Sequence, residues 1–245
     1  MFSWRAEVRS GVWVAFTDAA AGNLALHVGD DPAEVLHRRG ELEQAAGLGS
    51  RRFQYMNQVH GNDVATVGTG PVAAGAGAPT ADALVSRGEP LAVMVADCVP
   101  IVLVGEPGDG NPGGFPVLAA VHAGRPGVAS GVVPAAVARM RVLGAERLSA
   151  WIGPSICGSC YEVPERMRAD VAAAVPATWA ITSRGTPGLD LPAGVRSQLR
   201  ADGVGIEYSG GCTLEDGNLF SYRRNNRTGR FAGLVWAGSQ AGSHE

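Results

Sequence analysis

The sequence predicts an α/β fold, because continuous apolar runs alternate along the chain with segments of helical spacing. Residues 91–95 and 117–121 are apolar at every position. Such runs are typical of strands buried on both faces, since a half-exposed strand would alternate apolar and polar residues. The first run leads to Asp97-Cys98 and the second to His122, so polar side chains follow both predicted strands.

The N-terminal part of the chain predicts one strand and one helix. Residues 12–16 are apolar and have the length of a short strand. A helix is expected from the Asp31-Pro32 pair through Ala46, because proline is best tolerated in the first helical turn. Gly40 weakens this helix without forbidding it.

The middle of the chain predicts one further strand and two irregular segments. Residues 53–59 predict a strand that runs directly into His60. Residues 73–79 are rich in alanine and glycine and predict a loop. Residues 105–116 are rich in glycine and proline, and we expect a surface turn there because apolar strands lie on both sides.

The C-terminal half predicts three helices and a closing strand. Helical spacing extends over residues 128–143, with Pro134 either in the first turn or at a kink. Further helices are expected to start at residues 164–165 and 191–192. Residues 231–236 predict the last strand.

Composition and charge indicate a soluble, cytoplasmic protein with one domain spanning residues 1–245. Hydrophobic residues make up 46% of the chain, charged residues 18%, and the formal net charge is −3. This balance argues against a disordered tail and against a basic nucleic-acid surface. We find no signal peptide and no apolar run of the roughly 18 residues that a membrane helix needs.

The four cysteines are too few for a disulfide scaffold in a chain of this length, so reduced thiols or metal ligation are expected. Cys157 and Cys160 form a single Cys-x-x-Cys pair, which is a weak signal for metal or redox chemistry without a second pair. Ordinary thiols are the favoured interpretation of this pair. Cys212 is assigned to packing.

The strongest functional signal consists of His60, Cys98 and His122. Two imidazoles and one thiolate can hold a transition metal and leave one position open, which is the arrangement of a catalytic zinc. Each residue ends a predicted strand or lies beside glycine, and such strand-end loops carry the sites of α/β proteins. The three residues lie far apart in the sequence, so their spacing alone does not show that they meet in the fold.

Six motifs occur in order and resemble those of one family, the laccase-domain proteins. This family was once described as multicopper polyphenol oxidases and is now described as purine nucleoside phosphorylases. The resemblance extends from Leu26-His27-Val28-Gly29 to the C-terminal strand. The motifs that carry it are Gln58-Val59-His60-Gly61, Ala96-Asp97-Cys98-Val99-Pro100, His122-Ala123-Gly124, Ile152-Gly153-Pro154-Ser155-Ile156, Cys160-Tyr161-Glu162-Val163, and Ser221-Tyr222-Arg223-Arg224 with Thr228-Gly229-Arg230-Phe231-Ala232-Gly233.

The resemblance implies a fold, a metal and a reaction. The fold is an α/β (α+β) sandwich, with mixed β-sheets between helical layers. The metal is zinc on His60, Cys98 and His122, with copper as a second possibility. The reaction is the phosphorolysis of adenosine, inosine, guanosine or methylthioadenosine to free base and ribose 1-phosphate, with adenosine deamination as a possible second activity. The partners are a purine nucleoside and phosphate, with no nucleic acid or membrane, and the protein is a monomer or homodimer.

Phosphorolysis requires an anion site, and arginine suits phosphate because its planar guanidinium matches the phosphate oxygens. Arg223, Arg224 and Arg230 are candidates in a turn-forming segment, and Arg125 is a fourth. Glu162 is a candidate for the ribose hydroxyls or for acid–base work.

This chain departs from the family at two places. The family has His-Ala-Gly-Trp-Arg-Gly where this chain has Arg125 and Pro126 directly after Gly124, so contacts made by the family's tryptophan or arginine are in doubt. A Ser-x-Asn pattern keeps its asparagine as Asn23 but loses the serine. We assign Asn23 no role.

Three alternatives of other classes stay open. Cys98 activated by His122 could be the nucleophile of a cysteine hydrolase that cleaves an amide, such as a peptidoglycan precursor. A copper-dependent phenol oxidase fits less well, because a multicopper site uses many histidines and the chain has five. A metal-binding module without catalysis could form around Cys157 and Cys160.

Overall fold

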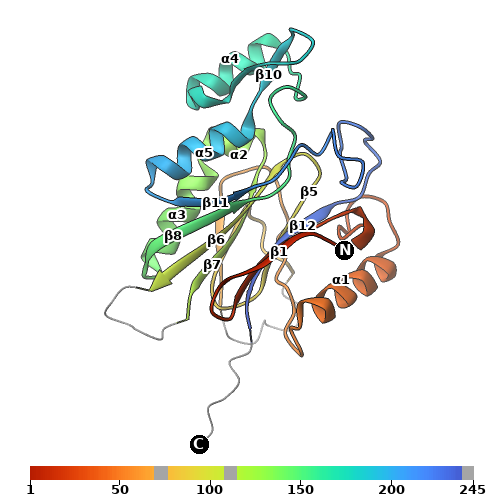
Figure 1. Cartoon of the computed structure of the whole chain (residues 1–245), viewed down its shortest axis with the longest axis vertical. Coiled ribbons are helices and arrows are strands. Elements are labelled where there is room, and N and C mark those ends of the chain that lie inside the picture. The colour runs from red at the N-terminus through yellow and green to blue at the C-terminus, as the bar shows by residue number, and fades with distance from the viewer. Residues whose placement is uncertain (69–76, 108–114, 239–245) are drawn as a thin grey trace, which may run out of the picture.

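The computed structural model describes residues 1–68, 77–107 and 115–238 (Figure 1). Two large sheets lie face to face. The larger sheet has six strands in the order β11-β8-β6-β7-β4-β3, and the smaller one has four in the order β1-β2-β12-β5. In the larger sheet the strands are β3 (Val64–Val67), β4 (Ala83–Arg87), β6 (Val99–Pro107), β7 (Val117–Ala123), β8 (Ala145–Ile152) and β11 (Gly205–Ser209).

The smaller sheet is antiparallel throughout, whereas the larger sheet is mixed. Parallel pairs occur at its two edges, between β3 and β4 and between β8 and β11. The strands of the smaller sheet are β1 (Phe2–Arg9), β2 (Val12–Thr17), β5 (Leu91–Val95) and β12 (Phe231–Ala237). A separate two-stranded ribbon pairs β9 (Trp179–Ile181) with β10 (Pro187–Leu189).

Helices cover the outer faces of both sheets, so the molecule has the layer order helix, sheet, sheet, helix (Figure 1). The outer face of the smaller sheet packs on α1 (Pro32–Ala46). The outer face of the larger sheet packs on α2 (Arg125–Ser130), α3 (Val132–Val142) and α5 (Leu191–Ala201), whereas α4 (Glu165–Ala174) packs on α2 and on the β9–β10 ribbon. This architecture confirms the α/β sandwich with its sheets between helical layers, one sheet being mixed and the other antiparallel.

The central strands carry long apolar runs because both of their faces are buried. In β6, Ile101 and Leu103 pack toward the helices, whereas Val102 and Val104 pack against the other sheet. All four are at most 2% exposed. Full burial of such a side chain stabilises the fold by about 1.5–3 kcal/mol relative to exposure, so this two-sided core holds the strand ends that lead to the site.

Several predicted elements are confirmed. The strands expected at residues 12–16, 91–95, 117–121 and 231–236 are β2, β5, β7 and β12. The helix expected at residues 31–46 is α1. The Asp31 carboxylate accepts a hydrogen bond from the amide of Ala33 at 2.9 Å, and Gly47 ends the helix in the left-handed region at φ 73°. Two further helices begin at Glu165 and Leu191 as expected.

The strand predicted over residues 53–59 is wrong. Within it, only Gln54 and Asn57 form isolated β-bridges. The Gln58 side-chain amide instead bonds both the carbonyl oxygen and the amide of Met94, at 2.7 and 3.0 Å. The backbone therefore pairs with β5 only at Gln54, and a side chain bonds the edge of β5 further along.

The helix predicted over residues 128–143 is two helices. Gly131 lies in the left-handed region at φ 84° and separates α2 from α3, which places Pro134 in the first turn of α3. The turn expected at 105–116 begins later, because β6 continues to Pro107, and residues 108–114 lie outside the described residues. Of the expected loop at 73–79, residues 73–76 also lie outside them. Among the described residues, no helix combines the length and apolarity needed to cross a membrane.

Candidate metal centre

His60, Cys98 and His122 converge, although 62 residues of chain separate the first from the last. One donor atom from each lies within 4.8 Å of the others. The Cys98 Sγ is 3.7 Å from the His60 Nε2. The centres of the His60 and His122 rings are 4.7 Å apart, and the ring planes meet at an angle of 75°. Zinc bonds of about 2.3 Å to sulfur and about 2.0–2.1 Å to nitrogen give a tetrahedral S···N edge of about 3.6 Å. The separation of the Cys98 and His60 donors therefore matches that of two ligands on a tetrahedral ion.

The buried carboxylate of Asp82 fixes both histidines. Its Oδ1 accepts a hydrogen bond from the His122 Nδ1 at 2.7 Å and one from the His60 amide at 2.9 Å. Its Oδ2 accepts from the amides of Gly61 at 2.6 Å and Val59 at 3.3 Å. Because the Nδ1 of His122 is engaged, its Nε2 is the nitrogen free for a metal, an arrangement common around ligating histidines.

Sequence reasoning missed Asp82. It is fully buried, yet it directly precedes the apolar strand β4. A charged residue at the entry of such a strand is the signal that could have identified it, since buried carboxylates require partners. Burial opposes ionisation of Asp82, but the hydrogen bonds from His122, Gly61 and His60 outweigh burial and lower its pKa.

Cys98 lies on the turn that connects the two sheets, between β5 and β6. Its neighbour Asp97 has a φ of 87°, which is rare for a residue other than glycine. Three contacts hold this conformation. The Asp97 carboxylate accepts from the Thr213 hydroxyl and the Arg223 amide, both at 2.6 Å, and its carbonyl oxygen accepts from the Ile156 amide at 3.0 Å.

Position 124 must be glycine, because a larger residue would collide with the neighbouring donor side chains. A Cβ at this position would lie 2.6 Å from the His60 Cδ2 and 3.3 Å from the Cys98 Sγ. In this motif His122 therefore supplies one donor, and Gly124 leaves the space that the side chains of His60 and Cys98 occupy.

The metal-free cluster favours a thiolate and an imidazolium. Burial opposes ionisation of Cys98, but the neighbouring charge of His122 and hydrogen bonds from both histidines lower its pKa to about 6. Burial likewise disfavours the charged form of His122, but Cys98 and Asp82 together raise the pKa of His122 to about 9. Cys98 is therefore ionised at neutral pH, which suits both metal ligation and nucleophilic attack.

The cluster opens into a cavity of 790 Å³. Arg125, Arg223 and Arg230, three of the arginines expected at a phosphate site, line it. The Arg223 guanidinium lies 5.1 Å from the ring centre of Tyr161, and that of Arg230 lies 5.8 Å from the ring centre of Tyr222. These cation–π contacts hold two of the three positive charges at the cavity wall.

Glu162 and Arg224 do not line this cavity. Glu162 forms an ion pair with Arg184 at 3.2 Å. Arg224 donates from its Nη1 to the carbonyl oxygens of Thr213, Leu214 and Asp216 at 3.1–3.2 Å and therefore supports a turn. The structure thus brings three of the five expected substrate residues to the metal cluster and leaves these two outside it.

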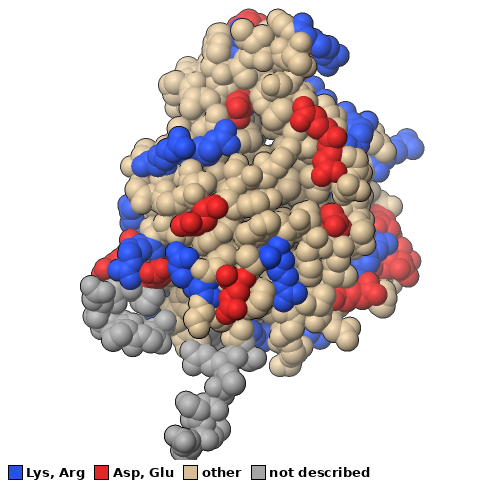
Figure 2. All heavy atoms as spheres, viewed as in Figure 1, with Lys and Arg blue, Asp and Glu red and all other residues tan. Residues whose placement is uncertain are grey.

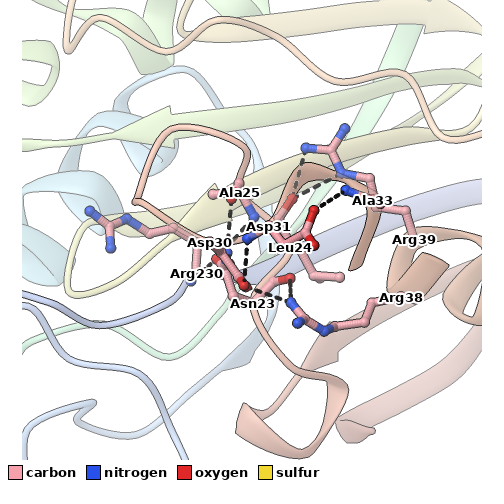
Figure 3. A network of polar contacts seen from close by, with 9 residues as sticks. All are labelled: Asn23, Leu24, Ala25, Asp30, Asp31, Ala33, Arg38, Arg39 and Arg230. Atoms are coloured by element: carbon pink, nitrogen blue, oxygen red, sulfur yellow. Dashed lines mark hydrogen bonds and ion pairs between the residues drawn. The ribbon is translucent and has the colours of Figure 1, made fainter. Parts of the chain in front are cut away.

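Two residues from the N-terminal part also serve the site. His27 lines the cavity, and burial together with the charges of Arg230 and Arg39 lowers its pKa. Asn23, to which no role was assigned, holds this segment in place (Figure 3). Its Oδ1 accepts from the amides of Ala25 and Arg230, both at 3.0 Å, and its Nδ2 donates to Asp30 at 3.1 Å.

Arg38 completes the same network by donating to the Asp30 carboxylate at 2.7 Å and to the carbonyl oxygen of Asn23 at 2.9 Å (Figure 3). The side chain of Arg230 extends away from the network, while its backbone is tied into it. Asn23 therefore connects residues 23–31 to Arg230, which lines the cavity. The asparagine kept from the family's Ser-x-Asn pattern is the sequence signal that could have identified this connection.

Comparisons with known proteins agree with this architecture. Residues 5–238 match the family model for the multi-copper polyphenol oxidoreductase laccase. A Streptomyces griseus protein named purine nucleoside phosphorylase ORF3 is 49% identical over 94% of this chain and 96% of its own length. A Corynebacterium glutamicum protein named purine nucleoside phosphorylase is 45% identical over 91% of this chain and 89% of its own.

Solved structures show the same fold. A Neisseria meningitidis protein superposes with a TM-score of 0.80 at 32% identity, covering 97% of this chain and 99% of that one. YlmD from Geobacillus stearothermophilus gives 0.79 at 30% identity, with coverage of 96% and 98%. The matched sequence, the shared fold and the ordered motifs agree, and the chain belongs to the multi-copper polyphenol oxidoreductase laccase family, whose relatives compared above carry the name purine nucleoside phosphorylase.

Proposed function

We propose that this chain is a zinc-dependent purine nucleoside phosphorylase. It would cleave adenosine, inosine, guanosine or methylthioadenosine with phosphate to give free base and ribose 1-phosphate. The observation that carries the proposal is the meeting of a three-donor metal cluster and three arginines at one cavity. The names of relatives at 45–49% identity support the same reaction. A single domain and a cytoplasmic location belong to this proposal as well.

Zinc is the metal we propose for His60, Cys98 and His122. One thiolate and two imidazoles are donors that zinc accepts, and their spacing fits its bond lengths. A zinc ion held by three side chains supplies a Lewis acid with an open position. Copper is the weaker candidate. The two groups of possible ligands among the described residues contain only two histidines, whereas a multicopper site needs many.

The arginines are proposed to bind phosphate. The chain has no lysine, so arginine is the residue that supplies permanent positive charge for an anion. Guanidinium groups match phosphate oxygens in pairs, so Arg125, Arg223 and Arg230 together could bind a dianion and orient one oxygen toward the sugar.

The reaction itself exchanges one bond for another. A phosphate oxygen attacks C1′ of the ribose while the bond from C1′ to the purine nitrogen breaks. The purine leaves with that electron pair and takes up one proton. The cavity volume lies within the range of about 300–1,000 Å³ that small-molecule sites use. Met94, Ile156 and Leu191 offer apolar surface for the base.

Adenosine deamination is a proposed second activity of the same site. It would replace the C6 amino group of adenosine with the oxygen of a water molecule and release ammonia, and a zinc ion held by His60, Cys98 and His122 would supply the Lewis acidity that lowers the pKa of that water. Inosine formed in the absence of phosphate would reveal this activity.

A cysteine hydrolase is the second candidate, and one specific observation favours it. Cys98, His122 and the buried Asp82 form a sequence of nucleophile, base and orienting carboxylate. Stoichiometric zinc that protects Cys98 from alkylation would argue for ligation. A trapped acyl-enzyme on Cys98 would argue for the hydrolase.

The test is phosphorolysis by the purified full chain. The protein is incubated with each nucleoside, with and without phosphate, and free base and ribose 1-phosphate are measured. We expect base release that depends on phosphate and yields ribose 1-phosphate in equal amount. The absence of phosphate-dependent base release from every purine nucleoside tested would contradict the proposal.

A further inference from the structure

A second group of metal-binding side chains lies outside the cavity. It consists of Cys157, Cys160, Cys212 and Glu215, whose donor atoms all lie within 4.8 Å of one another. The Cys160 Sγ is 3.4 Å from a Glu215 carboxylate oxygen. All three cysteines are free thiols and half-buried, and Glu215 is exposed. Cys212, which the sequence analysis assigns to packing, completes this group of three thiols.

The backbone holds this group in a defined shape. The amides of Cys160 and Tyr161 both donate to the carbonyl oxygen of Cys157, at 3.0 and 2.9 Å, which closes a tight turn between the first two cysteines. The Cys157 amide donates to the Cys212 Sγ at 3.4 Å. Such amide donors commonly stabilise sulfur that carries negative charge.

A short backbone pairing brings the third cysteine to the first two. Ser155 and Cys212 form a parallel β-bridge. The Ser155 amide donates to the carbonyl oxygen of Gly211, and its carbonyl oxygen accepts from the Thr213 amide, both at 3.1 Å. The two loops are thus joined by ordinary hydrogen bonds on one side and by the four candidate ligands on the other.

The chemistry of the group indicates a soft divalent cation. Three thiolates and a carboxylate are accepted zinc ligands, and a Cys-x-x-Cys turn plus a distant cysteine is a frequent way to supply them. Zinc bonds of about 2.3 Å to sulfur give S···S separations of about 3.8 Å. The donor atoms of this group all lie within 4.8 Å of one another, which is compatible with such separations. A single disulfide would use two of the thiols and leave the third unexplained.

We propose that Cys157, Cys160, Cys212 and Glu215 bind a second zinc ion. The protein fills all four positions, which is the character of a structural site, in contrast to the open position of the first cluster. The Arg224 guanidinium donates to the carbonyl oxygens of residues 213, 214 and 216 and so holds the turn that carries Cys212 and Glu215.

The second zinc would support the first cluster through Asp97. The loop of Cys157 begins at Ile156, whose amide binds the Asp97 carbonyl oxygen at 3.0 Å. The loop of Cys212 continues to Thr213, whose hydroxyl binds the Asp97 carboxylate at 2.6 Å. Joining these loops holds Asp97 in its left-handed conformation and thereby positions the adjacent Cys98.

Zinc content per chain tests the proposal. Four full-length proteins are purified with added zinc and a reducing agent: wild type, Cys98→Ser, the double variant Cys160→Ser/Cys212→Ser, and the triple variant that combines them. We expect two, one, one and no zinc ions per chain, respectively. Ser159→Ala, an exposed change inside the Cys-x-x-Cys turn, is the matched control and should keep two.

The Cys98→Ser protein separates this proposal from that for the first cluster. It should retain one zinc whose X-ray absorption spectrum shows a shell dominated by sulfur at about 2.3 Å. If the first cluster binds no metal, wild type and Cys98→Ser will both hold one zinc with this same spectrum, and the second site still stands.

Three results would overturn the second site. They are a Cys98→Ser protein without zinc, a double variant with as much zinc as wild type, and a disulfide among these cysteines in the folded wild type. If the double variant does not fold, thiol counting in wild type replaces it. Cys157, Cys160 and Cys212 should resist alkylation until a chelator is added, and their rapid alkylation without chelator would contradict the proposal.

Discussion

At the scale of single residues, Asp82 does most to organise the cluster, because one buried carboxylate receives hydrogen bonds from both ligand-bearing segments. It orients the His122 ring and fixes the backbone of His60, which has a φ of 62°. Sequence motifs identified the three donors and missed this carboxylate. Asp82 meets the donor-bearing residues only in the folded structure. It therefore has no fixed sequence spacing from them that a motif could show.

The substitution Asp82→Asn should weaken metal binding about 10- to 100-fold, because the amide keeps the shape but loses the negative charge that orients His122. Zinc affinity measured by competition with a chelator checks this. Asp63→Asn is the matched control, since Asp63 is an exposed carboxylate in the same region. Equal affinities for the two variants would show that Asp82 does not support the metal.

A pH titration of Cys98 reports on the same charges. In metal-stripped protein, alkylation of Cys98 should rise with pH through a midpoint at about 6, since the lowered pKa makes the thiolate dominant above that pH. Mass spectrometry of the Cys98 peptide gives the rate. His122→Gln removes the positive neighbour, so its midpoint should shift upward. A wild-type midpoint near the ordinary thiol value of about 8.5 would contradict the described electrostatics.

At the scale of elements, the sequence predicts best those strands whose two faces are both buried. The apolar runs of β5 and β7 were identified within two residues of their ends. The strand β1 was missed although Phe2, Trp4, Ala6 and Val8 alternate with polar residues, which is the pattern of a half-exposed strand. The strand predicted at residues 53–59 failed for a tertiary reason, because its backbone bridges β5 only at Gln54 and the Gln58 side chain is the partner of β5 at Met94.

The helix α1 offers a direct test of its local energetics. Gly40 is exposed, and an added Cβ there would meet nothing within 4 Å. Gly40→Ala should therefore raise the free energy of unfolding by about 0.5–1 kcal/mol in urea denaturation. Gly47→Ala, at the left-handed end of the same helix, should lower it by about 1–2 kcal/mol. Equal effects of the two substitutions would contradict the described helix end.

At the scale of the whole molecule, the site forms where the two sheets meet. The chain passes from the smaller sheet to the larger one at Cys98, His122 lies in β7 of the larger sheet, and Arg230 directly precedes β12 of the smaller one. The sequence could supply these residues but not their convergence, because convergence depends on strand order. On the face shown in Figure 2, arginines and acidic residues are interspersed, whereas three arginines meet at the cavity.

We propose that the three-donor cluster and the site of phosphorolysis are one. The most direct measurement compares phosphate-dependent release of base from inosine or adenosine by wild type, His60→Ala and Cys98→Ala, with bound zinc counted in the same samples. We predict that each variant loses the zinc of this cluster and at least about 100-fold in kcat/KM, consistent with losing a Lewis-acid contribution of several kcal/mol. Wild-type rates of ribose 1-phosphate formation in a variant that lacks this zinc would contradict the account.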